Sequence, residues 1–471
     1  MATVTNIPDE ILIRIFRNLT GYDSARSRTV CHKWNSILRE LTAKDDAWTK
    51  FCANEIDEDI LLDISSCRDL NEIAAHIASD IHPFFAWKTL YVKWYRMRRV
   101  KTWKKIRTEI PCCEEQARVF TVKFNGDFLF TGSMNCGNVS IWNHLTCELV
   151  DVVTVPGKTA CGVTDIQLFY QQNSNVSGEN VCHTMCDLDG DELSNVNKEL
   201  MLEFLDINLP FRACLICYRM GAVFTDLYNC FKKDNRRQFI CIKGKNPSFS
   251  AFGNRVVMAA ADHVISGHRV VELAADHLKP QLRYNLYGHA QPPLVVKIWK
   301  NEVMSLSSQG DLLVWDLSRG KSTADVGDDV VGLQTGLAHE VINVFEEVVH
   351  NLILRTDIII CVTVSGLLFM STNHGYNFVK HNVWESLGGN AVLAALWGSL
   401  FVIGTTAGKI HAYHVESYRD FQKIDITNPS FSEQITSAQV TCIDIGDDGD
   451  GPMIAVGTSD GKVVVIRWFN G

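Results

Sequence analysis

Cysteine and histidine residues with metal-ligand spacing occur at two places in the sequence. Cys214 and Cys217 form a Cys-x-x-Cys pair, and Cys182, His183 and Cys186 lie close together in the chain. The residues around the first pair read as a β-strand, in which side chains three apart point to opposite faces, so one metal ion cannot bind both. The second group lacks a partner pair at zinc-finger spacing. We therefore expect unreactive thiols and no metal ion.

Acidic residues with partial calcium-loop spacing follow the second group. Asp187, Asp189 and Asp191 alternate, but the glycine is Gly190 at the fourth position and the twelfth residue is Lys198. An EF-hand loop needs glycine at the sixth position and glutamate at the twelfth, so we expect an acidic loop without calcium. The sequence contains no P-loop or H-E-x-x-H motif. We expect no catalytic activity and no cofactor.

One basic cluster stands out further along the chain. It consists of Lys232, Lys233, Arg236 and Arg237. Guanidinium groups pair bidentately with phosphate, so the cluster is a candidate for binding a phosphate group. The alternative is a solvated hairpin, and the sequence leaves both interpretations open.

The composition is that of an ordinary soluble protein. The chain has 471 residues, 46% hydrophobic and 21% charged, with a formal net charge of −9. This balance argues against a nucleic-acid partner, because such proteins usually carry a basic domain or stripe. The longest apolar runs, residues 358–370 and 391–403, are too short to span a bilayer, so we expect no membrane partner. The 16 cysteines are scattered and no secretory signal is visible, which predicts a cytoplasmic or nuclear protein.

The first 110 or so residues have helical periodicity. Two apolar stripes recur at helical spacing, the first made of Ile7, Ile11, Leu12, Ile15, Phe16 and Leu19, and the second of Val30, Trp34, Ile37, Leu38 and Leu41. We expect Gly21 to end the first helix, and residues 46–53 and 56–79 to add further helix. Residues 83–107 predict a longer helix with nine Lys or Arg between Lys88 and Arg107. We expect this basic face to be solvated, and a nuclear-localisation or acidic-surface patch is the alternative.

From about residue 115 onwards, short β-rich segments alternate with turns of Gly, Asp, Asn and Ser. A strand–turn–strand phrase recurs, with turn glycines at Gly137, Gly310, Gly366, Gly408 and Gly461. Their spacing fits a unit of about 40–45 residues with four strands, the pattern of β-propeller blades. Seven or eight four-stranded blades fit, with eight slightly favoured. The polar residues 170–199 are expected to form an insertion loop.

The end of the chain predicts how the ring closes. The last blade reaches Phe469 at what reads as its third strand, only two residues before the last residue of the sequence. An unpaired edge would invite aggregation, so a fourth strand has to come from elsewhere. We expect residues 103–109 to supply it.

The N-terminal residues 7–40 resemble the F-box motif. The matching elements are Ile7-Pro8, Glu10-Ile11-Leu12, Ile15-Phe16, Leu19, Asp23, and Val30-Cys31 with Trp34. Ser24 departs from the pattern, which prefers Leu there. The resemblance implies binding to the Skp adaptor and through it to a cullin, with an interface made of Pro8, Ile11, Leu12, Ile15, Phe16, Val30 and Trp34. The alternative is packing within the protein itself, which we favour for Leu19, Leu38 and Leu41.

The strand repeats resemble WD repeats, and residues 87–103 resemble the linker of F-box/WD-repeat proteins. The best copy runs from Gly288-His289 to Trp315-Asp316. In WD repeats a His, a Ser or Thr, an Asp and a Trp form a buried hydrogen-bond chain. The residues implied for it here are His289, Ser305 or Ser307, Trp315 and Asp316. Most other repeats lack the Gly-His and Trp-Asp dipeptides, so apolar packing has to hold them.

Together the resemblances imply an all-α F-box (1–50), a helical linker (51–102) and an all-β propeller (103–471). Such a protein is the non-catalytic substrate-recognition subunit of an SCF-type ubiquitin-protein ligase, and its propeller binds a target protein, phosphorylated or not. Several members of this family grip phosphorylated targets with arginines of the propeller, so the resemblance makes Lys232, Lys233, Arg236 and Arg237 candidates for target binding. Two alternatives stay open. One is a propeller scaffold with a non-degradative F-box role, and the other is a propeller enzyme.

Overall fold

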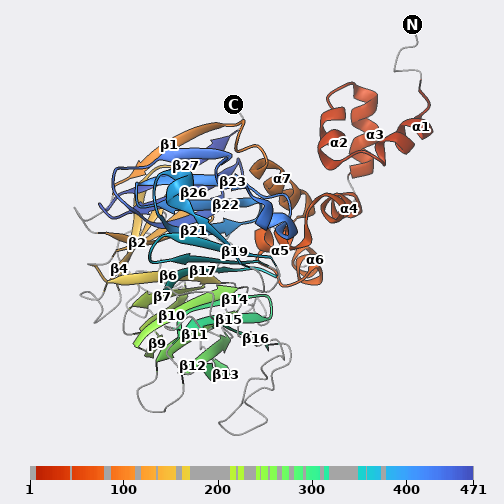
Figure 1. The fold of residues 1–471 in the computed structure, drawn as a ribbon. Coiled ribbons are helices and arrows are strands. Elements are labelled where there is room, and N and C mark those ends of the chain that lie inside the picture. The colour runs from red at the N-terminus through yellow and green to blue at the C-terminus, as the bar shows by residue number, and fades with distance from the viewer. Residues whose placement is uncertain are drawn as a thin grey trace, which may run out of the picture.

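The computed structural model describes the chain in eighteen stretches, beginning with α-helices and continuing with β-strands (Figure 1). They are residues 7–42, 45–78, 86–111, 118–133, 136–154, 162–169, 213–218, 221–226, 240–243, 245–252, 255–261, 268–274, 281–289, 293–307, 312–317, 348–356, 358–372 and 378–469. No helix within these stretches has the length and apolar character needed to cross a membrane.

The N-terminal region is helical, as the apolar stripes predict. Its helices are α1 (Asp9–Phe16), α2 (Gly21–Ser27), α3 (His32–Thr42), α4 (Asp45–Glu55), α5 (Glu58–Ser65), α6 (Leu70–Ala78) and α7 (Trp87–Met97). The prediction that Gly21 ends the first helix is wrong, because α1 ends at Phe16 and Gly21 begins α2. The hydroxyl of Thr20 accepts a hydrogen bond from the Asp23 N–H and so caps the start of α2.

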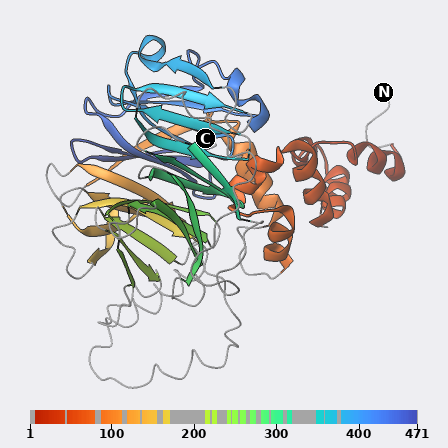
Figure 2. The ribbon, with the colours of Figure 1, turned by 60° about the horizontal axis from the view of Figure 1, so that its bottom comes forward.

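Helices α1–α3 have a small hydrophobic core of their own. Its buried members are Leu12, Phe16, Ile37 and Leu38, and the partly buried side chains packed against them are Ile7, Ile13, Leu19, Trp34 and Leu41. This confirms the inward packing expected for Leu19, Leu38 and Leu41. The three helices project away from the sheets, whereas α5 and α7 contact strands of the sheets and α4 packs on α7 (Figures 1 and 2).

The remaining described residues fold mainly into seven antiparallel sheets. The first four sheets are β2 (Val119–Asn125), β3 (Phe128–Ser133), β4 (Asn138–Asn143) and β5 (Glu148–Thr154); β6 (Val163–Phe169), β7 (Ala213–Tyr218), β8 (Gly221–Asp226) and β9 (Ile240–Lys243); β10 (Lys245–Phe252), β11 (Arg255–Ala261), β12 (His268–Ala274) and β13 (Gln281–His289); and the three-stranded β14 (Pro293–Trp299), β15 (Glu302–Ser307) and β16 (Leu312–Asp316).

The last three sheets lie in the C-terminal part of the chain. They are β17 (Val349–Leu354), β18 (Ile359–Thr363), β19 (Leu367–Ser371) and β20 (Val379–Asn382); β21 (Ala391–Trp397), β22 (Leu400–Thr405), β23 (Lys409–His414) and β24 (Phe431–Gln434); and β25 (Val440–Asp447), β26 (Pro452–Thr458) and β27 (Val463–Phe469) with β1 (Lys104–Ile110). Helix α10 (Val383–Leu387) connects β20 to β21, and the 3₁₀ helix η6 (Tyr418–Lys423) lies between β23 and β24.

The first strands of these sheets follow one another around a common axis, so the sheets are the blades of a β-propeller. Strand β2 contacts β6, β6 contacts β10, and the series continues through β14, β17 and β21 to β25, which contacts β2 again. The slight preference for eight blades finds no eighth sheet in the stretches that the structure describes.

The predicted closure of the last blade is confirmed. Strand β1 pairs antiparallel with β27 as the outermost strand of that sheet, with Lys104 opposite Phe469 and Ile110 opposite Val463. The predicted segment, 103–109, is displaced by one residue from the observed strand. A strand from before the propeller thus completes the blade formed by the end of the chain.

Three blades share one type of hairpin between their second and third strands. Thr363, Thr405 and Thr458 each use the side-chain hydroxyl to bond a backbone group four residues later. The turn glycines Gly366, Gly408 and Gly461 have φ values of 88°, 70° and 86°. Residues with a side chain rarely adopt such positive φ values. The last hairpin reads Gly-Thr-Ser-Asp-Gly, a G-x-S-x-G sequence. It joins two strands, whereas a nucleophile elbow joins a strand to a helix.

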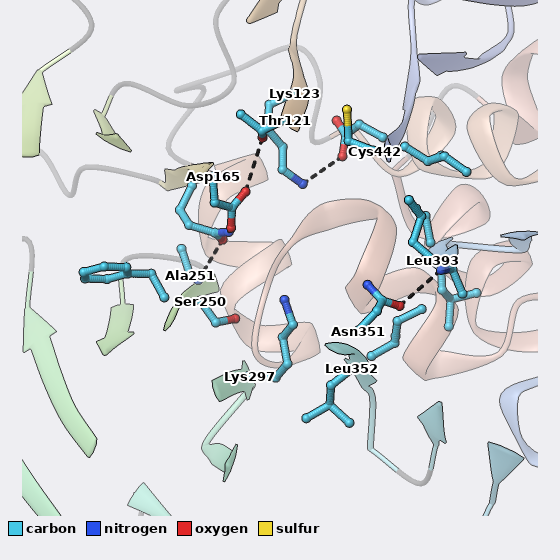
Figure 3. Close-up of a pocket in the computed structure, with 18 of the residues that line it drawn as sticks. Thr121, Lys123, Asp165, Ser250, Ala251, Lys297, Asn351, Leu352, Leu393 and Cys442 are labelled. Carbon is cyan, nitrogen blue, oxygen red and sulfur yellow. Dashed lines mark hydrogen bonds and ion pairs between the residues drawn. The ribbon is translucent and has the colours of Figure 1, made fainter. Parts of the chain in front are cut away.

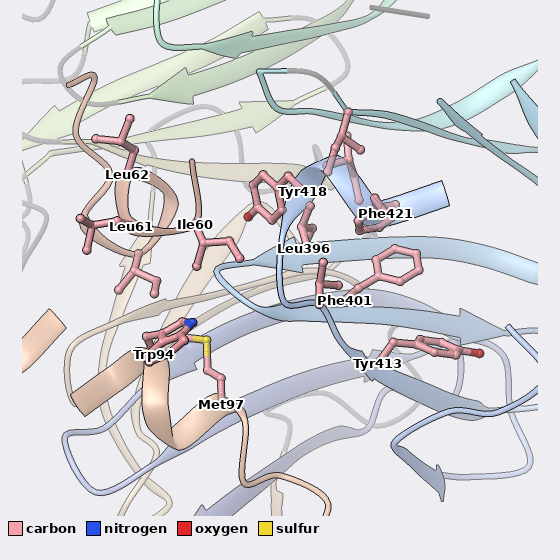
Figure 4. Close-up of a cluster of buried hydrophobic side chains, with 14 of the residues drawn as sticks. Ile60, Leu61, Leu62, Trp94, Met97, Leu396, Phe401, Tyr413, Tyr418 and Phe421 are labelled. Carbon is pink, nitrogen blue, oxygen red and sulfur yellow. The ribbon is translucent and has the colours of Figure 1, made fainter. Parts of the chain in front are cut away.

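Helices α4–α7 share one hydrophobic core with the sheets β17–β20 and β21–β24. Ile60, Trp94 and Met97 of the helices belong to the same cluster as Phe401 and Phe421 of the propeller side (Figure 4). The linker helices are therefore packed as part of the propeller body.

Candidate functional site

The apolar stripe of α1 is only half covered by the protein itself. Leu12 and Phe16 are 1% and 3% exposed, whereas Ile11 and Ile15 on the same helix are 49% and 47% exposed. Leu12 and Phe16 therefore support this helix from inside. The two isoleucines lie one helical turn apart and are available to a partner.

The other residues expected at the interface are also divided. Pro8 is exposed, and Val30, in the turn before α3, is 57% exposed. Trp34 is half-buried, and its ring meets Phe16 edge to face at 5.1 Å between centroids. Of the residues expected at the interface, Pro8, Ile11, Ile15 and Val30 are thus the accessible ones, and Trp34 links this surface to the core.

A close contact joins this small helical domain to α7. An added Cβ on Gly21 would lie 2.7 Å from Tyr91 Cζ, so only glycine fits at the start of α2. The Tyr22 N–H donates to the Tyr91 hydroxyl at 3.1 Å, and this hydroxyl donates to Glu55 Oε2 at 2.7 Å. Glu55 Oε1 accepts from the Gly21 N–H at 2.9 Å. This network fixes the orientation of α2 relative to α4 and α7.

Three carboxylates of α5 and its cap hold the helices on the propeller. Asp57 accepts a hydrogen bond from Ser417 at 2.6 Å. Asp59 pairs with Lys300 at 2.7 Å and accepts from the Thr356 hydroxyl at 2.6 Å. The loops contacted by Asp59 lie after β14 and after β17, so one helix bridges neighbouring blades.

Asp63 makes the most buried of these contacts. Its Oδ1 lies 2.9 Å from Arg355 Nη2, and its Oδ2 accepts from the Tyr418 hydroxyl at 2.7 Å and the Gly398 N–H at 2.8 Å. Burial raises the pKa of Asp63, and Arg355, Tyr418 and the Gly398 N–H oppose this increase. Arg355 also stacks over Trp299, 4.5 Å from the ring centroid. Both charges are compensated only while α5 stays in place.

Several basic residues of the linker contact the propeller although most of its Lys and Arg side chains stay exposed, so the expected solvated face is found only in part. Arg96 donates to the Gly449 carbonyl, and Arg98 pairs with Glu416 at 3.2 Å. Lys105 pairs with Glu433, and Arg107 donates to the carbonyl of Gln434 at 3.0 Å. These positive side chains reinforce the docking of α7 and β1.

A polar cavity of about 790 Å³ runs along the propeller axis and is lined by the first strands of all seven sheets (Figure 3). Asp63 and Ser66 of the α5 region line one end of it. Thr121, Asp165, Lys297 and Asn351 lie in the interior, and Lys123 pairs with Asp444 at 3.0 Å. We refer to this cavity as the axial channel.

Polar side chains of the first strands connect neighbouring blades around the axial channel. Each accepts a hydrogen bond from a backbone N–H of the next blade: Asp444 from Phe124 (2.8 Å), Gln167 from Ala251 (3.2 Å), Ser248 from Val296 (3.1 Å), Ser250 from Ile298 (3.2 Å) and Asn351 from Ala394 (3.1 Å). These residues were not predicted from the sequence. The available signal was a polar side chain at alternate positions of an otherwise apolar first strand.

The structure places the residues implied for the WD-type hydrogen-bond chain on three neighbouring strands. Ser305 and Ser307 are buried in β15, Asp316 ends β16, and Trp315 lies opposite Val303 in the backbone ladder. His289 lies at the end of β13. A buried Trp-to-Thr hydrogen bond of the expected type occurs in another blade, where Trp142 Nε1 donates to Thr131 Oγ1 at 3.1 Å.

The candidates for metal or phosphate chemistry are mostly outside the described residues. This holds for Cys182, His183, Cys186, the Asp187–Asp191 run, and the cluster of Lys232, Lys233, Arg236 and Arg237. Cys214 and Cys217 lie in strand β7, as predicted, and burial raises the pKa of the Cys217 thiol. Within the described stretches, no group of three or more His, Cys, Asp or Glu side chains is arranged to hold a metal ion.

One known protein family matches part of the chain. No curated protein matches the chain. Among solved structures, the computationally designed Ika8 protein (crystal packing No.1 in P63) matches over 77% of this chain and 99% of its own, with 13% identity and a TM-score of 0.43, too low to define the fold. Residues 4–54, which include α1–α3 and most of α4, match the family model described as F-box-like, so the chain has an F-box-like domain at its N-terminus, followed by a β-propeller.

Proposed function

We propose that this protein is the substrate-recognition subunit of an SCF-type ubiquitin-protein ligase. In this proposal α1–α3 bind a Skp adaptor and through it a cullin, and the propeller binds a target protein. The protein itself catalyses nothing. The carrying observation is the division of α1, on which Ile11 and Ile15 stay half exposed while Leu12 and Phe16 are buried. Exposed apolar side chains gathered on one small domain are typical of a protein-binding surface.

The contacts of α5 support this function mechanically. A ligase receptor has to hold its target at a fixed distance from the conjugating enzyme. The bonds of Asp57, Asp59 and Asp63 to the propeller, and the shared core of α4–α7, restrict rotation of the helices. The network of Tyr91 and Glu55 then extends this rigidity to α2.

The number and the type of the blades are also part of the proposal. We infer seven WD-repeat-like blades, since seven described sheets follow one another and β25 returns to β2. The proposed compartment is the cytoplasm or nucleus. Eight of the described cysteines are free thiols, which agrees with a reducing compartment: Cys31, Cys52, Cys67, Cys136, Cys147, Cys217, Cys361 and Cys442.

Recovery of adaptor and cullin with the tagged full chain tests the proposal. Ile11→Asp with Ile15→Asp places two charges in the interface and should lower recovery at least tenfold, a loss of about 1.4 kcal/mol or more. Ile106→Asp is the matched control, because Ile106 of β1 is also 49% exposed and lies outside α1–α3. Unchanged recovery with the double variant would overturn the proposal. Adaptor binding without ubiquitination of any bound protein would favour a non-degradative scaffold.

A further inference from the structure

Lys297 is the exception among the polar residues of the axial channel. It lies in β14, on the first strand of its blade, where other blades place the residues that accept an N–H from the next blade. An ammonium group has no acceptor and cannot form such a bond. Among the described residues, Lys297 Nζ has no hydrogen bond or ion pair. Figure 3 shows its side chain extending into the channel.

Two other cations of the channel lining are already paired, and a third, Arg118, lies over the Phe120 ring at 5.0 Å from its centroid. Lys123 pairs with Asp444, and Arg355 pairs with Asp63. Asp165 accepts hydrogen bonds from Thr121 at 3.3 Å, from Gln167, and from the Ile166 N–H at 2.8 Å. Its negative charge attracts Lys297 without reaching it as an ion pair. Of the two described lysines that line the channel, Lys297 is therefore the one whose ammonium group has room for an added anion.

Two neutral donors face the same part of the channel. Asn351 uses its Oδ1 to accept from the Ala394 N–H at 3.1 Å, which leaves its NH₂ group directed towards the channel (Figure 3). Ser250 accepts from the Ile298 N–H at 3.2 Å, so its own hydroxyl hydrogen remains to be donated. The bonds between blades thus orient both side chains with their donors towards the space around Lys297.

The poor solvation of the Lys297 ammonium group favours a bound anion. Burial lowers the pKa of Lys297, and the Asp165 carboxylate opposes this decrease. A partly buried ammonium group without a partner is costly, and an anion that pairs with it removes much of that cost.

We propose that Lys297, with Asn351 and Ser250, binds a single carboxylate group inside the axial channel, and that the carboxylate comes from an acidic side chain of a bound protein segment. One unmatched ammonium balances one negative charge. A phosphate carrying two would leave one uncompensated beside Asp165. The α5 region lines one end of the channel, so the segment enters at the other end, where Leu294 is 39% exposed and His350 is exposed. The inference names the chemistry of the target in the proposed function, but the site itself does not depend on adaptor binding.

The Cε resonance of Lys297 in full-length protein carrying [6-¹³C]lysine provides the readout, assigned by its loss in Lys297→Met. The peptide acetyl-Gly-Gly-Glu-Gly-Gly-amide should shift this resonance saturably, with an affinity at least tenfold above that of the Gln peptide and of inorganic phosphate. Acetate distinguishes a free small carboxylate from a protein side chain. A shift with acetate but none with the Glu peptide would overturn the protein source.

Two variants separate charge from folding. Lys297→Arg keeps the positive charge and should retain peptide binding within about threefold, whereas Lys297→Met should lose it. Peptide binding to both variants is followed by intrinsic Trp fluorescence. Lys409→Met removes an exposed lysine of β23 and should change nothing. No shift of the Lys297 resonance with any anion, or equal binding of the Gln peptide, overturns the site. Because adaptor recovery is measured separately, failure here leaves the ligase proposal standing.

Discussion

At the scale of single residues, the propeller buries polar side chains where each has one defined bond. His144 illustrates this. It is 1% exposed, its Nε2 lies 3.2 Å from the Gly126 carbonyl, and its Nδ1 has no hydrogen-bond partner among the described residues. The neutral ring satisfies the carbonyl as a donor, whereas the protonated ring would place a second donor against no acceptor. Burial accordingly lowers the pKa of His144 to about 4.

This depressed pKa predicts a loss of stability in mild acid. Below pH 6.5 the unfolded chain binds a proton on this histidine that the folded chain does not, so the free energy of unfolding falls as pH decreases from 7 towards 4. Between pH 7 and pH 5 the contribution of His144 is on the order of 2 kcal/mol. His144→Gln keeps a donor for Gly126 and should remove this part of the pH dependence in urea denaturation. His32→Gln, at an exposed position of α3, is the control and should leave the pH dependence unchanged.

At the scale of elements, α5 acts as the connection between helices and propeller. Asp63 and Arg355 are mutually dependent, because neither charge has another ionic partner among the described contacts. Removing one member of a buried ion pair typically costs about 3–5 kcal/mol, since the other charge stays buried without compensation. The exposed pair of Asp420 and Lys423 lies close by in η6 and provides a contrast. Exposed pairs contribute at most about 1 kcal/mol.

Asp63→Asn should therefore lower the free energy of unfolding by about 3 kcal/mol, whereas Asp420→Asn should lower it by less than about 1 kcal/mol. Urea denaturation measures both. Adding Arg355→Met to Asp63→Asn removes the stranded charge and should recover part of the loss, which appears as non-additivity in a double-mutant cycle. Equal effects of the two Asp→Asn changes would mean that the buried pair does not hold α5 in place.

These contacts between elements were not predictable from the sequence. The apolar stripes predicted α1 and α3, because their spacing is a property of the helix itself. The partners of Asp57, Asp59 and Asp63 lie about 240–360 residues away in the chain, and no local pattern links them. The same reason explains why the propeller contacts of Arg96 and Arg98, at the end of α7, were not predicted. Composition gives the charge of a surface but not what covers it.

At the scale of the whole molecule, the propeller was predictable because its blades repeat the same strand–turn–strand pattern. The fourth strand of the last blade was predicted from the need to cover an edge, and β1 supplies it. Burial could not be predicted in the same way. Leu12 and Ile11 are neighbours of similar hydrophobicity, yet one is 1% and the other 49% exposed. Only the packing of α1 on α3 distinguishes them.

The packing also bears on where the chain can be divided. A boundary at residue 102 separates α4–α7 from the sheets, but these helices share one core with them. A chain cut at residue 102 would lose Trp48, Trp94 and Met97, which belong to the same hydrophobic cluster as Phe401 and Phe421 of the propeller. Apolar propeller residues of this cluster would then be uncovered. The core of α1–α3 has no member in that cluster. The division between the two hydrophobic cores therefore lies between α3 and α4, and the contacts of Gly21 and Tyr22 with Tyr91 and Glu55 cross it.

A chain beginning at Asp45 should consequently keep the thermal stability of the full chain to within a few degrees, while losing the adaptor. A chain beginning at Trp103 keeps the closing strand β1 but exposes the core, and should melt at least about 10 °C lower, since each large buried side chain contributes about 1.5–3 kcal/mol. Thermal denaturation with light scattering measures both. Equal stability of the two shortened chains would show that α4–α7 are a separable linker. In that case the fixed distance between adaptor and target would depend on the α5 ion pairs alone.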